Sequence, residues 1–400
     1  MDKLKNKTVL IVGGGFGQLP AIKKALDLNL EVVVVDKNPD APGMKLAHHS
    51  YPVDIIDIEG VLDIAKKYSI DGVLTMQTDL PIPTIGAIND ELNLNGVSYS
   101  TALNCSYKME TRKLLRQKNV SQPDFVIVKS KEEAFEAAQK INYPVIIKAV
   151  DSSGSRGVTK VTCEKGVQSA YEEALKYTRQ KEILVEEFID GVELGAQAFS
   201  VGGKCVKVLL HNDTIANGEF MVPTGHSFPI SLLPEEMNYA EDAVKECVEA
   251  LGIKEGPSNI DLILDPNGKA KIIEVGARIG ATCLPELVYH YSGIDWVENT
   301  ILNALNCSTD FTQKKEQSCA AVILESKEDG VLKEIEIPDS VSSHEDLLEL
   351  EVTEEVGNFV SKLRKGTDRI GKVVVKANSS KEAEIKAEEL KGEIKFHVRD

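Results

Sequence analysis

Features that would mark a secreted, membrane or nucleic-acid-binding protein are absent from this sequence. Its seven cysteines in 400 residues are an odd number without a Cys-x-x-Cys pair, which argues against a disulfide framework and against a zinc site. No apolar run approaches the roughly 20 residues that span a bilayer. The first apolar run, residues 9–12, is cut by glycines and is too short for a signal peptide. We therefore expect reduced thiols and a cytoplasmic protein without a membrane partner.

Positive charge is also scarce. The 46 Lys and Arg residues are outnumbered by 63 Asp and Glu residues, which leaves a net charge of −17. An acidic chain repels the phosphates of nucleic acids, so no nucleic-acid partner is expected. With 42% hydrophobic and 27% charged residues, the composition is that of a globular protein. At roughly 150 residues per domain, the length predicts two or three domains.

The first part of the chain alternates between strands and helices. An apolar run at residues 8–12 leads into a glycine-rich turn at residues 13–17 and then into a helical pattern. Two further apolar runs, at residues 32–35 and 72–76, are separated by another helical pattern. This alternation predicts a doubly wound parallel sheet, that is, a Rossmann-like α/β domain over residues 1–98.

The glycine-rich turn leaves three readings open. Gly13 and Gly15 open a helix after a strand, and Asp36 follows about 20 residues later, where a dinucleotide fingerprint has its ribose-binding carboxylate. The third glycine of that fingerprint is missing, because Gln18 occupies its place. The turn is therefore compatible with a nicotinamide cofactor, with a different small ligand, or with a purely structural role.

The remainder of the chain predicts three further parts. Residues 99–122 form a linker dominated by one long helix, residues 99–118. Residues 123–188 form a compact α+β unit, and residues 189–400 form a larger α+β unit. Within the larger unit, the turn at residues 265–268, Asp-Pro-Asn-Gly, joins two apolar runs into a hairpin.

A lysine and several glutamates around the compact unit suggest a bound nucleotide. Lys148 ends an apolar strand and precedes a Gly/Ser-rich loop, residues 152–157, whose backbone N–H groups could close around phosphate oxygens. The next apolar strand ends at Glu186 and Glu187, and Glu193 follows a turn. Taken singly, the lysine also fits an edge strand, and each glutamate also fits a solvated surface.

Paired carboxylates in the predicted hairpin suggest a metal ion. Asp261 and Glu274 fall on adjacent strands among apolar neighbours, where two like charges are unfavourable without a cation between them. Two carboxylates suit Mg²⁺ carried with a nucleotide. Arg278 lies on the same side as Glu274 by strand alternation and would face a phosphate or a carboxylate. An ordinary hairpin with an Asp–Arg pair is the alternative.

The order of these residues along the chain carries a resemblance to a known family. With Lys108 on a helix, Lys148 before a Gly/Ser loop, and the later carboxylates and arginine, the sequence resembles the ATP-grasp superfamily of carboxylate-amine ligases. The similar branch contains biotin carboxylase, carboxyaminoimidazole ribonucleotide synthetase, the formate-dependent glycinamide ribonucleotide transformylase and bacterial L-amino-acid ligases. The resemblance covers almost the whole chain and is most specific at residues 32–43, 143–157 and 273–278.

The resemblance implies a two-part ATP-grasp fold after the Rossmann-like domain, with residues 123–188 as a lid, and it implies roles for individual residues. The ATP-binding residues would be Lys108, Lys148, Ser153, Gly154, Ser155, Glu186, Glu187, Phe188, Ile189 and Glu193. The Mg²⁺ ligands would be Asp261 and Glu274, with Mn²⁺ as an alternative metal. The substrate contacts would be Gly15, Phe16, Gly17, His226 and Arg278, and the catalytic residues Lys148 and Arg278.

Two positions bear on how far the resemblance extends. His226 belongs to a Gly-His-x-x-Pro segment found in amino-acid-ligase-like members, and a core histidine is the alternative reading. Many members have Asn two residues after the metal-binding Glu, whereas this chain has Gly276 there. We interpret the glycine as a lost side-chain ligand and not as a sign of an inactive enzyme.

The resulting functional hypothesis is an ATP-dependent ligase that acts on small molecules. ATP would convert a carboxylate into an acyl phosphate, releasing ADP, and an amine or a thiol would then attack the acyl carbon. The resemblance leaves a homodimer open. Three alternatives stay open: a bicarbonate-using carboxylase of the ribonucleotide-synthetase type, a nicotinamide-dependent oxidoreductase, and a non-catalytic nucleotide sensor.

Overall fold

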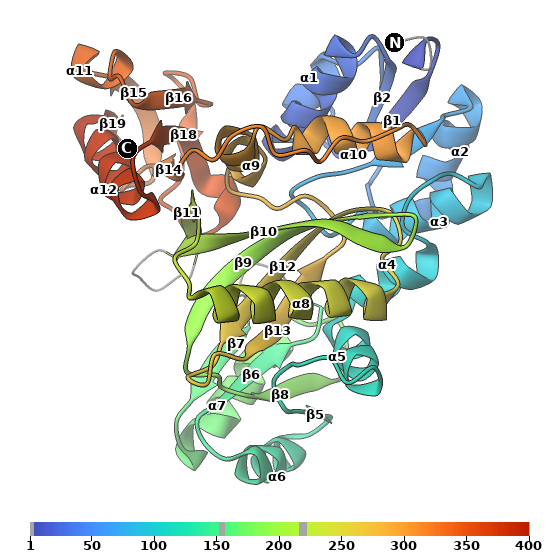
Figure 1. Ribbon diagram of the computed structural model, residues 1–400, viewed down its shortest axis with the longest axis vertical. Helices are drawn as coiled ribbons and strands as arrows, with labels where there is room; N and C mark the ends of the chain where they lie inside the picture. The colour runs from blue at the N-terminus through green and yellow to red at the C-terminus, as the bar shows by residue number, and fades with distance from the viewer. Residues whose placement is uncertain (1–3, 152–156, 216–221, 400) are drawn as a thin grey trace.

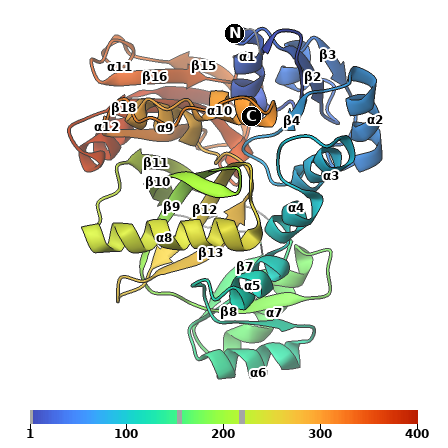
Figure 2. The same ribbon diagram turned by 45° about the vertical axis from the view of Figure 1, so that its right-hand side comes forward.

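The computed structural model describes residues 4–151, 157–215 and 222–399, and it confirms the predicted mixed α/β architecture. Figures 1 and 2 show a first unit and a C-terminal closing region at one end of the molecule, a small sheet at the other end, and a large sheet between them. Among the described residues, no helix combines the length and the apolar character that crossing a membrane requires.

The first unit is a parallel sheet, as predicted, and its strand order is β3-β2-β1-β4. Its elements are β1 (Thr8–Val12), η2 (Phe16–Gln18), α1 (Leu19–Asp27), β2 (Glu31–Val35), η3 (Pro42–Lys45), β3 (His49–Tyr51), α2 (Ile58–Tyr68), β4 (Gly72–Leu74) and α3 (Ile82–Leu92). Strands β1, β2 and β4 are mainly buried apolar runs, as expected of parallel strands covered on both faces, whereas the edge strand β3 is polar and partly exposed.

The single long linker helix predicted for residues 99–118 is wrong. The structure has two helices, α4 (Tyr99–Ser106) and α5 (Lys108–Gln117), separated at Tyr107, whose backbone is extended with φ −109° and ψ 108°. The break lets the backbone N–H of Lys108 bond the carbonyl of Val150 at 3.2 Å. Helix α5 therefore begins directly against the small sheet.

The small sheet has the antiparallel strand order β5-β8-β6-β7. Its unit consists of β5 (Phe125–Val128), α6 (Lys131–Ile141), β6 (Val145–Ala149), β7 (Val158–Val161), η4 (Glu164–Gly166), α7 (Val167–Lys176) and β8 (Ile183–Glu187). Buried residues of α6 and α7 form one core with β6 and β8, so this α+β unit has its own hydrophobic interior.

The large sheet has the strand order β13-β12-β9-β10-β11-β14-β18-β16. Before the closing region the chain contributes β9 (Val192–Val201), β10 (Lys204–Ile215), β11 (Pro223–Phe228), α8 (Pro234–Leu251), β12 (Gly256–Leu264), β13 (Ala270–Gly276), α9 (Leu284–Ser292) and α10 (Trp296–Ala304). The predicted hairpin at residues 265–268 is confirmed, because β12 and β13 pair antiparallel across it.

The closing region completes the large sheet and adds a short sheet, β17-β15-β19. It comprises β14 (Cys319–Glu325), β15 (Gly330–Glu336), α11 (Asp339–Ser342), β16 (Leu347–Val352), β17 (Phe359–Val360), η5 (Gly366–Asp368), β18 (Arg369–Lys376), α12 (Ser380–Glu393) and β19 (Lys395–Arg399). Helix α12 covers the face of β14 that carries Ala320 and Val322.

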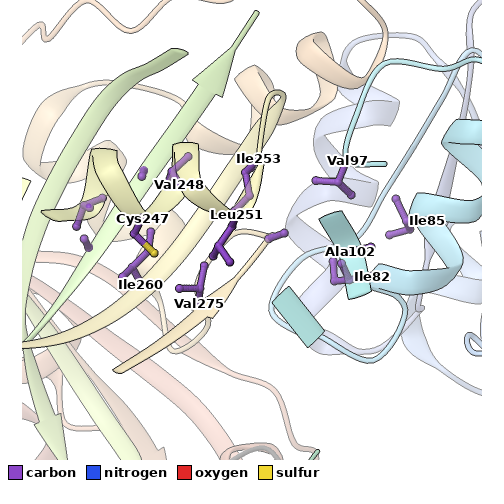
Figure 3. Packing of buried hydrophobic residues seen from close by; sticks show 14 of the residues in the cluster. Ile82, Ile85, Val97, Ala102, Cys247, Val248, Leu251, Ile253, Ile260 and Val275 are labelled. Carbon is purple, nitrogen blue, oxygen red and sulfur yellow. The ribbon is translucent and has the colours of Figure 1, made fainter. Parts of the chain in front are cut away.

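One hydrophobic cluster joins the first unit to the large sheet. Figure 3 shows Ile82, Ile85 and Ala102 of α3 and α4 in the same cluster as Leu251 of α8 and Val275 of β13. Continuous apolar packing of this kind fixes the first unit against the hairpin. The division of the chain after residues 98, 122 and 188 stays a prediction.

Candidate active site

Strand register assembles polar side chains on one face of the large sheet. Asp261 of β12 lies directly opposite Glu274 of β13 on one side and Gly195 of β9 on the other. Gly195 in turn lies opposite His211 of β10. Directly paired residues point to the same face of a sheet. The predicted metal pair therefore shares a face with His211, and the opposite face packs against α8.

The next pair along β10 extends the same face. Asp213 lies two residues after His211 and directly opposite His226 of β11. The glycine at position 195 makes this arrangement possible, since a Cβ atom there would lie 2.1 Å from Cε1 of the His211 ring. The structure thus brings the predicted substrate residue His226 onto the face that carries Asp261 and Glu274.

A bulge in β13 aims Glu274, the glutamate predicted to bind the metal. The register of the hairpin shifts after the Asp261–Glu274 pair, so that Leu262 pairs with Ile272 and Ile273 is the extra residue. The carbonyls of Ile272 and Ile273 accept hydrogen bonds from Nη1 and Nη2 of Arg112 at 2.9 and 2.8 Å. Arg112 of α5 therefore stabilises the backbone that presents Glu274.

The same arginine takes part in a buried ion triad. Arg112 Nε lies 2.6 Å from Glu186 Oε1, and Lys148 Nζ lies 2.7 Å from Glu186 Oε2, with all three side chains buried. Burial would raise the pKa of Glu186, but the two cations outweigh it and lower the pKa to about 2. Burial lowers the pKa of Lys148, and repulsion by Arg112 and Lys108 adds to the shift against the attraction of Glu186. The predicted phosphate-binding lysine thus lies among other buried cations.

The other predicted phosphate-binding lysine contacts the metal pair. Lys108 Nζ donates to Glu274 Oε1 at 2.7 Å. Burial would raise the pKa of Glu274, but the charge of Lys108 outweighs it and lowers the pKa. Lys108 and Arg112 lie four residues apart on one face of α5, so the helix presents two cations to two strands.

Asp261 has no comparable cation. Burial raises the pKa of Asp261 to about 7, and repulsion by Glu274 adds to the shift. A divalent cation between Asp261 and Glu274 would favour the ionised form of Asp261, because its charge would offset both the burial of Asp261 and the repulsion by Glu274. Carboxylate oxygens are also the ligands that such a cation prefers. Asp261 and Glu274 are therefore the residues that could hold Mg²⁺.

Arg278 contacts the carboxylate of Asp79, which was not predicted from the sequence. Its Nη2 donates to Asp79 Oδ2 at 2.8 Å, from a loop that follows β4 of the first unit. Asp79 Oδ1 and Arg278 Nε are buried atoms without a hydrogen-bond partner among the described residues. A Cβ atom on Gly276 would lie 2.6 Å from Asp79 Oδ1. The carboxylate of Asp79 therefore occupies the space that a side chain at position 276 would need.

The histidine segment forms a cluster around one carboxylate. His226 Nδ1 donates to Asp213 Oδ1 at 2.7 Å. His211 Nδ1 lies 2.9 Å from the same oxygen, outside hydrogen-bond alignment. Burial lowers the pKa of His211. Burial would raise the pKa of Asp213, but the two imidazoles outweigh it and lower the pKa.

The backbone N–H groups of the glycine-rich turn donate hydrogen bonds to side chains of the same unit. Asp36 Oδ2 accepts from the backbone N–H of Gly14 at 2.8 Å, and Gln18 Oε1 accepts from that of Gly15 at 3.1 Å. Gln18 Nε2 donates to the carbonyl of Met76 at 2.6 Å. The carboxylate considered for a ribose is thus engaged by the turn itself. The predicted substrate residues Gly15, Phe16 and Gly17 lie in this turn, with Phe16 exposed.

The predicted adenine and ribose residues lie along β8 and the start of β9. Glu187 Oε2 accepts from the backbone N–H of Asp124 at 3.1 Å, and Lys160 Nζ lies 3.4 Å from the centre of the Phe188 ring. Ile189 is buried, and Glu193 is exposed. The predicted phosphate loop residues Ser153, Gly154 and Ser155 lie outside the described residues.

Sequence reasoning missed four polar residues of this site. Arg112 could have been found, because it follows Lys108 at helical spacing. Asn259 was visible two residues before Asp261 on the same strand face. Gln197 and Asp79 carried no local signal, because only the sheet register and the packing of the first unit bring them to the site.

Three known domain families match consecutive parts of the chain. The PylC-like N-terminal domain matches residues 9–99, the ATP-grasp domain matches residues 141–286, and the L-amino acid ligase C-terminal domain 2 matches residues 322–399. The ATP-grasp match contains Asp261 and Glu274. The chain contains an ATP-grasp domain. The prediction of an ATP-dependent, C–N bond-forming ligase is confirmed at the level of this family, whose members use ATP and Mg²⁺.

Relatives of the ATP-grasp protein are found by sequence. An uncharacterized protein of Sinorhizobium fredii is 25% identical over 404 residues, which cover 96% of this chain and 81% of the relative. The formate-dependent phosphoribosylglycinamide formyltransferase of Sulfurisphaera tokodaii is 31% identical over 194 residues, or 46% of this chain and 47% of the relative. The match therefore spans about half the length of that formyltransferase.

Solved structures match the ATP-grasp protein along its length. The crystal structure of phosphoribosylglycinamide synthetase from Anaerococcus prevotii has a TM-score of 0.84 and 28% identity, and the match covers 99% of this chain and 100% of that one. The L-amino acid ligase from Bacillus licheniformis has a TM-score of 0.85 and 24% identity, with 99% of both chains covered. The second likeness concerns the fold alone.

Proposed function

We propose that this ATP-grasp protein is an ATP-dependent carboxylate-amine ligase that activates an amino acid as its acyl phosphate. The observation that carries the proposal is that the Asp261–Glu274 pair of the large sheet meets Arg278, Lys108 of α5 and the charge of Lys148 from the small sheet. The L-amino acid ligase C-terminal domain at residues 322–399 supports an amino acid as the acid.

The chain's own residues would perform the chemistry mainly by positioning and charge stabilisation. Lys108 and Lys148 would hold phosphate oxygens of ATP and stabilise the charge that develops on the transferred phosphoryl group. Arg278 would bind the oxygens of the acid with its parallel N–H donors and orient one oxygen toward the γ-phosphorus. Bound Mg²⁺, held by Asp261 and Glu274, would neutralise phosphate charge; Mn²⁺ as a substitute stays a prediction.

The order of events follows from the need to activate a carboxylate. An oxygen of the acid attacks the γ-phosphorus, the bond to ADP breaks, and an acyl phosphate forms. The amine nitrogen then attacks the acyl carbon and phosphate leaves. His226 and the glycine-rich turn at residues 13–17 would contact the substrates, as the family resemblance implies.

The proposal is tested by trapping the activated acid. The protein is incubated with ATP, Mg²⁺, hydroxylamine and each L-amino acid in turn, and both ADP and hydroxamate are measured. We expect an acid-dependent hydroxamate that matches the ADP released. ADP release without hydroxamate for every amino acid would contradict the proposal.

A second candidate function uses a one-carbon acid. The 31% identity to the formate-dependent formyltransferase favours this candidate. The candidate also covers a carboxylase that uses bicarbonate as the acid. In the same assay, ADP release that depends on formate or bicarbonate and not on any amino acid would support this candidate. A homodimer remains a prediction under either function.

A further inference from the structure

The side chain of Gln197 fixes the polarity of a hydrogen-bond network next to the metal pair. The backbone N–H of Gly280 donates to Gln197 Oε1 at 3.0 Å, so the other end of the amide is the nitrogen. That nitrogen donates to Asn259 Oδ1 at 2.6 Å and lies 3.4 Å from His211 Nε2. Asn259 Nδ2 donates onward to Asp261 Oδ1 at 3.2 Å. The network therefore links the metal pair to His211.

The surroundings of His211 decide which ring nitrogen carries its proton. Its Nε2 faces the N–H donors of Gln197, and its Nδ1 lies 2.9 Å from a carboxylate oxygen of Asp213. A lone pair that faced the carboxylate would be repelled, and a proton that faced the amide would meet another donor. His211 is therefore the Nδ1–H tautomer, which keeps Asp213 ionised.

The same reasoning fixes His226. Its Nδ1 lies 2.7 Å from Asp213 Oδ1, so that nitrogen donates, and the neutral ring has its lone pair on Nε2. Among the described residues, Nε2 has no hydrogen-bond partner, and it is not one of the fully buried polar atoms. A histidine whose Nδ1–H is held by a carboxylate and whose Nε2 is available has the arrangement of a general base.

Building on the proposed function, we propose that His226 Nε2 is the base that accepts a proton from the incoming amine, with Asp213 as its positioning residue. An amine arrives as an ammonium ion and must lose two protons to become an amide. One proton passes to His226 Nε2. As the C–N bond forms and the C–O bond to phosphate breaks, phosphate leaves with the electron pair and takes the second proton as hydrogen phosphate.

The arrangement distinguishes this role from two others. A metal ion held by the three side chains would need a lone pair on Nδ1 of His226, whereas that nitrogen donates its proton to Asp213 Oδ1. A histidine that only bound the acid's carboxylate would be needed before the acyl phosphate forms. The base acts afterwards, so the two half-reactions separate these roles.

The test compares two nucleophiles on the same activated acid. The amino acid with the highest hydroxamate yield is used with hydroxylamine, which is uncharged at neutral pH, or with a second amino acid as the amine. In His226→Gln, we expect amide formation to fall 100-fold or more while the hydroxamate yield stays within twofold. Asp213→Asn should lower amide formation at least 10-fold with the same selectivity. His49→Gln, which alters an exposed His–Glu pair of the first unit, is the matched control.

Several results would overturn the inference. If His226→Gln loses hydroxamate and amide in parallel while still binding ATP in calorimetry, the histidine binds the acid. If amide formation is unchanged in both variants, neither residue assists the amine. Tight binding of Zn²⁺ to the wild type that His226→Gln abolishes would make the cluster a metal site. If wild type forms neither product, the proposed function itself fails, and this step with it.

Discussion

Arg278 Nη2 donates a hydrogen bond to Asp79 Oδ2 at 2.8 Å, and this contact joins the loop after β4 to the end of the β12–β13 hairpin. Burial would lower the pKa of Arg278, but Asp79, together with the charges of Asp261 and Glu274, outweighs it and raises the pKa. The guanidinium is therefore charged and already oriented by a carboxylate. A substrate carboxylate would meet the same donors.

Arg278→Lys should reduce use of the acid without reducing ATP binding. An ammonium keeps the charge but loses the parallel donors that match two oxygens. We expect kcat/KM for the acid to fall about 10- to 1000-fold, roughly 1.4 to 4 kcal/mol. Steady-state kinetics with the acid, together with calorimetry of nucleotide binding, measures both quantities. Near-normal kinetics would mean that Arg278 serves only as the partner of Asp79.

Gly276→Ala should disturb the same ion pair. The added Cβ atom would lie 2.6 Å from Asp79 Oδ1 and 3.1 Å from Arg278 Cζ, so one side chain has to move. We expect at least a 10-fold loss of kcat/KM for the acid. The loss should be smaller when Gly276→Ala is made in an Asp79→Ala background, because the closest contact of the new Cβ atom, with Asp79 Oδ1, is then gone. Gly366→Ala is the control, since a Cβ atom there meets nothing within 4 Å.

Glu274→Gln should abolish most ADP production while the protein stays folded. The substitution removes one carboxylate of the pair and the anionic partner of Lys108. We expect turnover to fall about 100-fold or more, since the metal and the phosphates lose their anchor. Circular dichroism checks the fold, and calorimetry with Mg²⁺-ATP checks binding. Wild-type ADP production by this variant at saturating Mg²⁺ would show that the metal is held elsewhere.

Glu186 should make stability sensitive to acid. Its folded pKa of about 2 lies below the ordinary value of 4.5, so its stabilising contribution is present above pH 4.5 and is lost as the pH falls through the folded pKa. The full contribution is on the order of 3 kcal/mol. Urea unfolding at pH 7 and pH 3 should show Glu186→Gln less stable at pH 7, with the difference from wild type narrowing at pH 3. A difference that is constant across this range would contradict the assignment.

Local patterns predicted the parts of the site that lie close together in the sequence. Asp261 and Glu274 flank the turn at residues 265–268, so the turn placed them on adjacent strands, whereas the bulge at Ile273 that sets them opposite each other was not predicted. The first sheet was also predicted from local patterns, because its strands are short apolar runs separated by helical patterns. The break at Tyr107 was missed, because neither glycine nor proline marks it and helical periodicity continues on both sides.

Long-range contacts could not be predicted from local patterns. Asp79 reaches Arg278 only because helices of the first unit pack against the hairpin, and no spacing in the sequence encodes that packing. Glycine is required at position 195 because the His211 ring on the neighbouring strand occupies the space of a Cβ atom. Such pairings depend on sheet order, which the sequence alone left undetermined.

Arg112 links a strand of the small sheet to a strand of the large sheet through its guanidinium group. Its Nε and Nη2 bind Glu186 on β8 of the small sheet, and Nη1 and Nη2 bind the carbonyls of Ile272 and Ile273 on β13 of the large sheet. A guanidinium is planar and rigid, so one group sets the spacing between these two strands. A shorter or more flexible side chain at position 112 would leave that spacing, and with it the distance from Glu186 to the hairpin, without a fixed value.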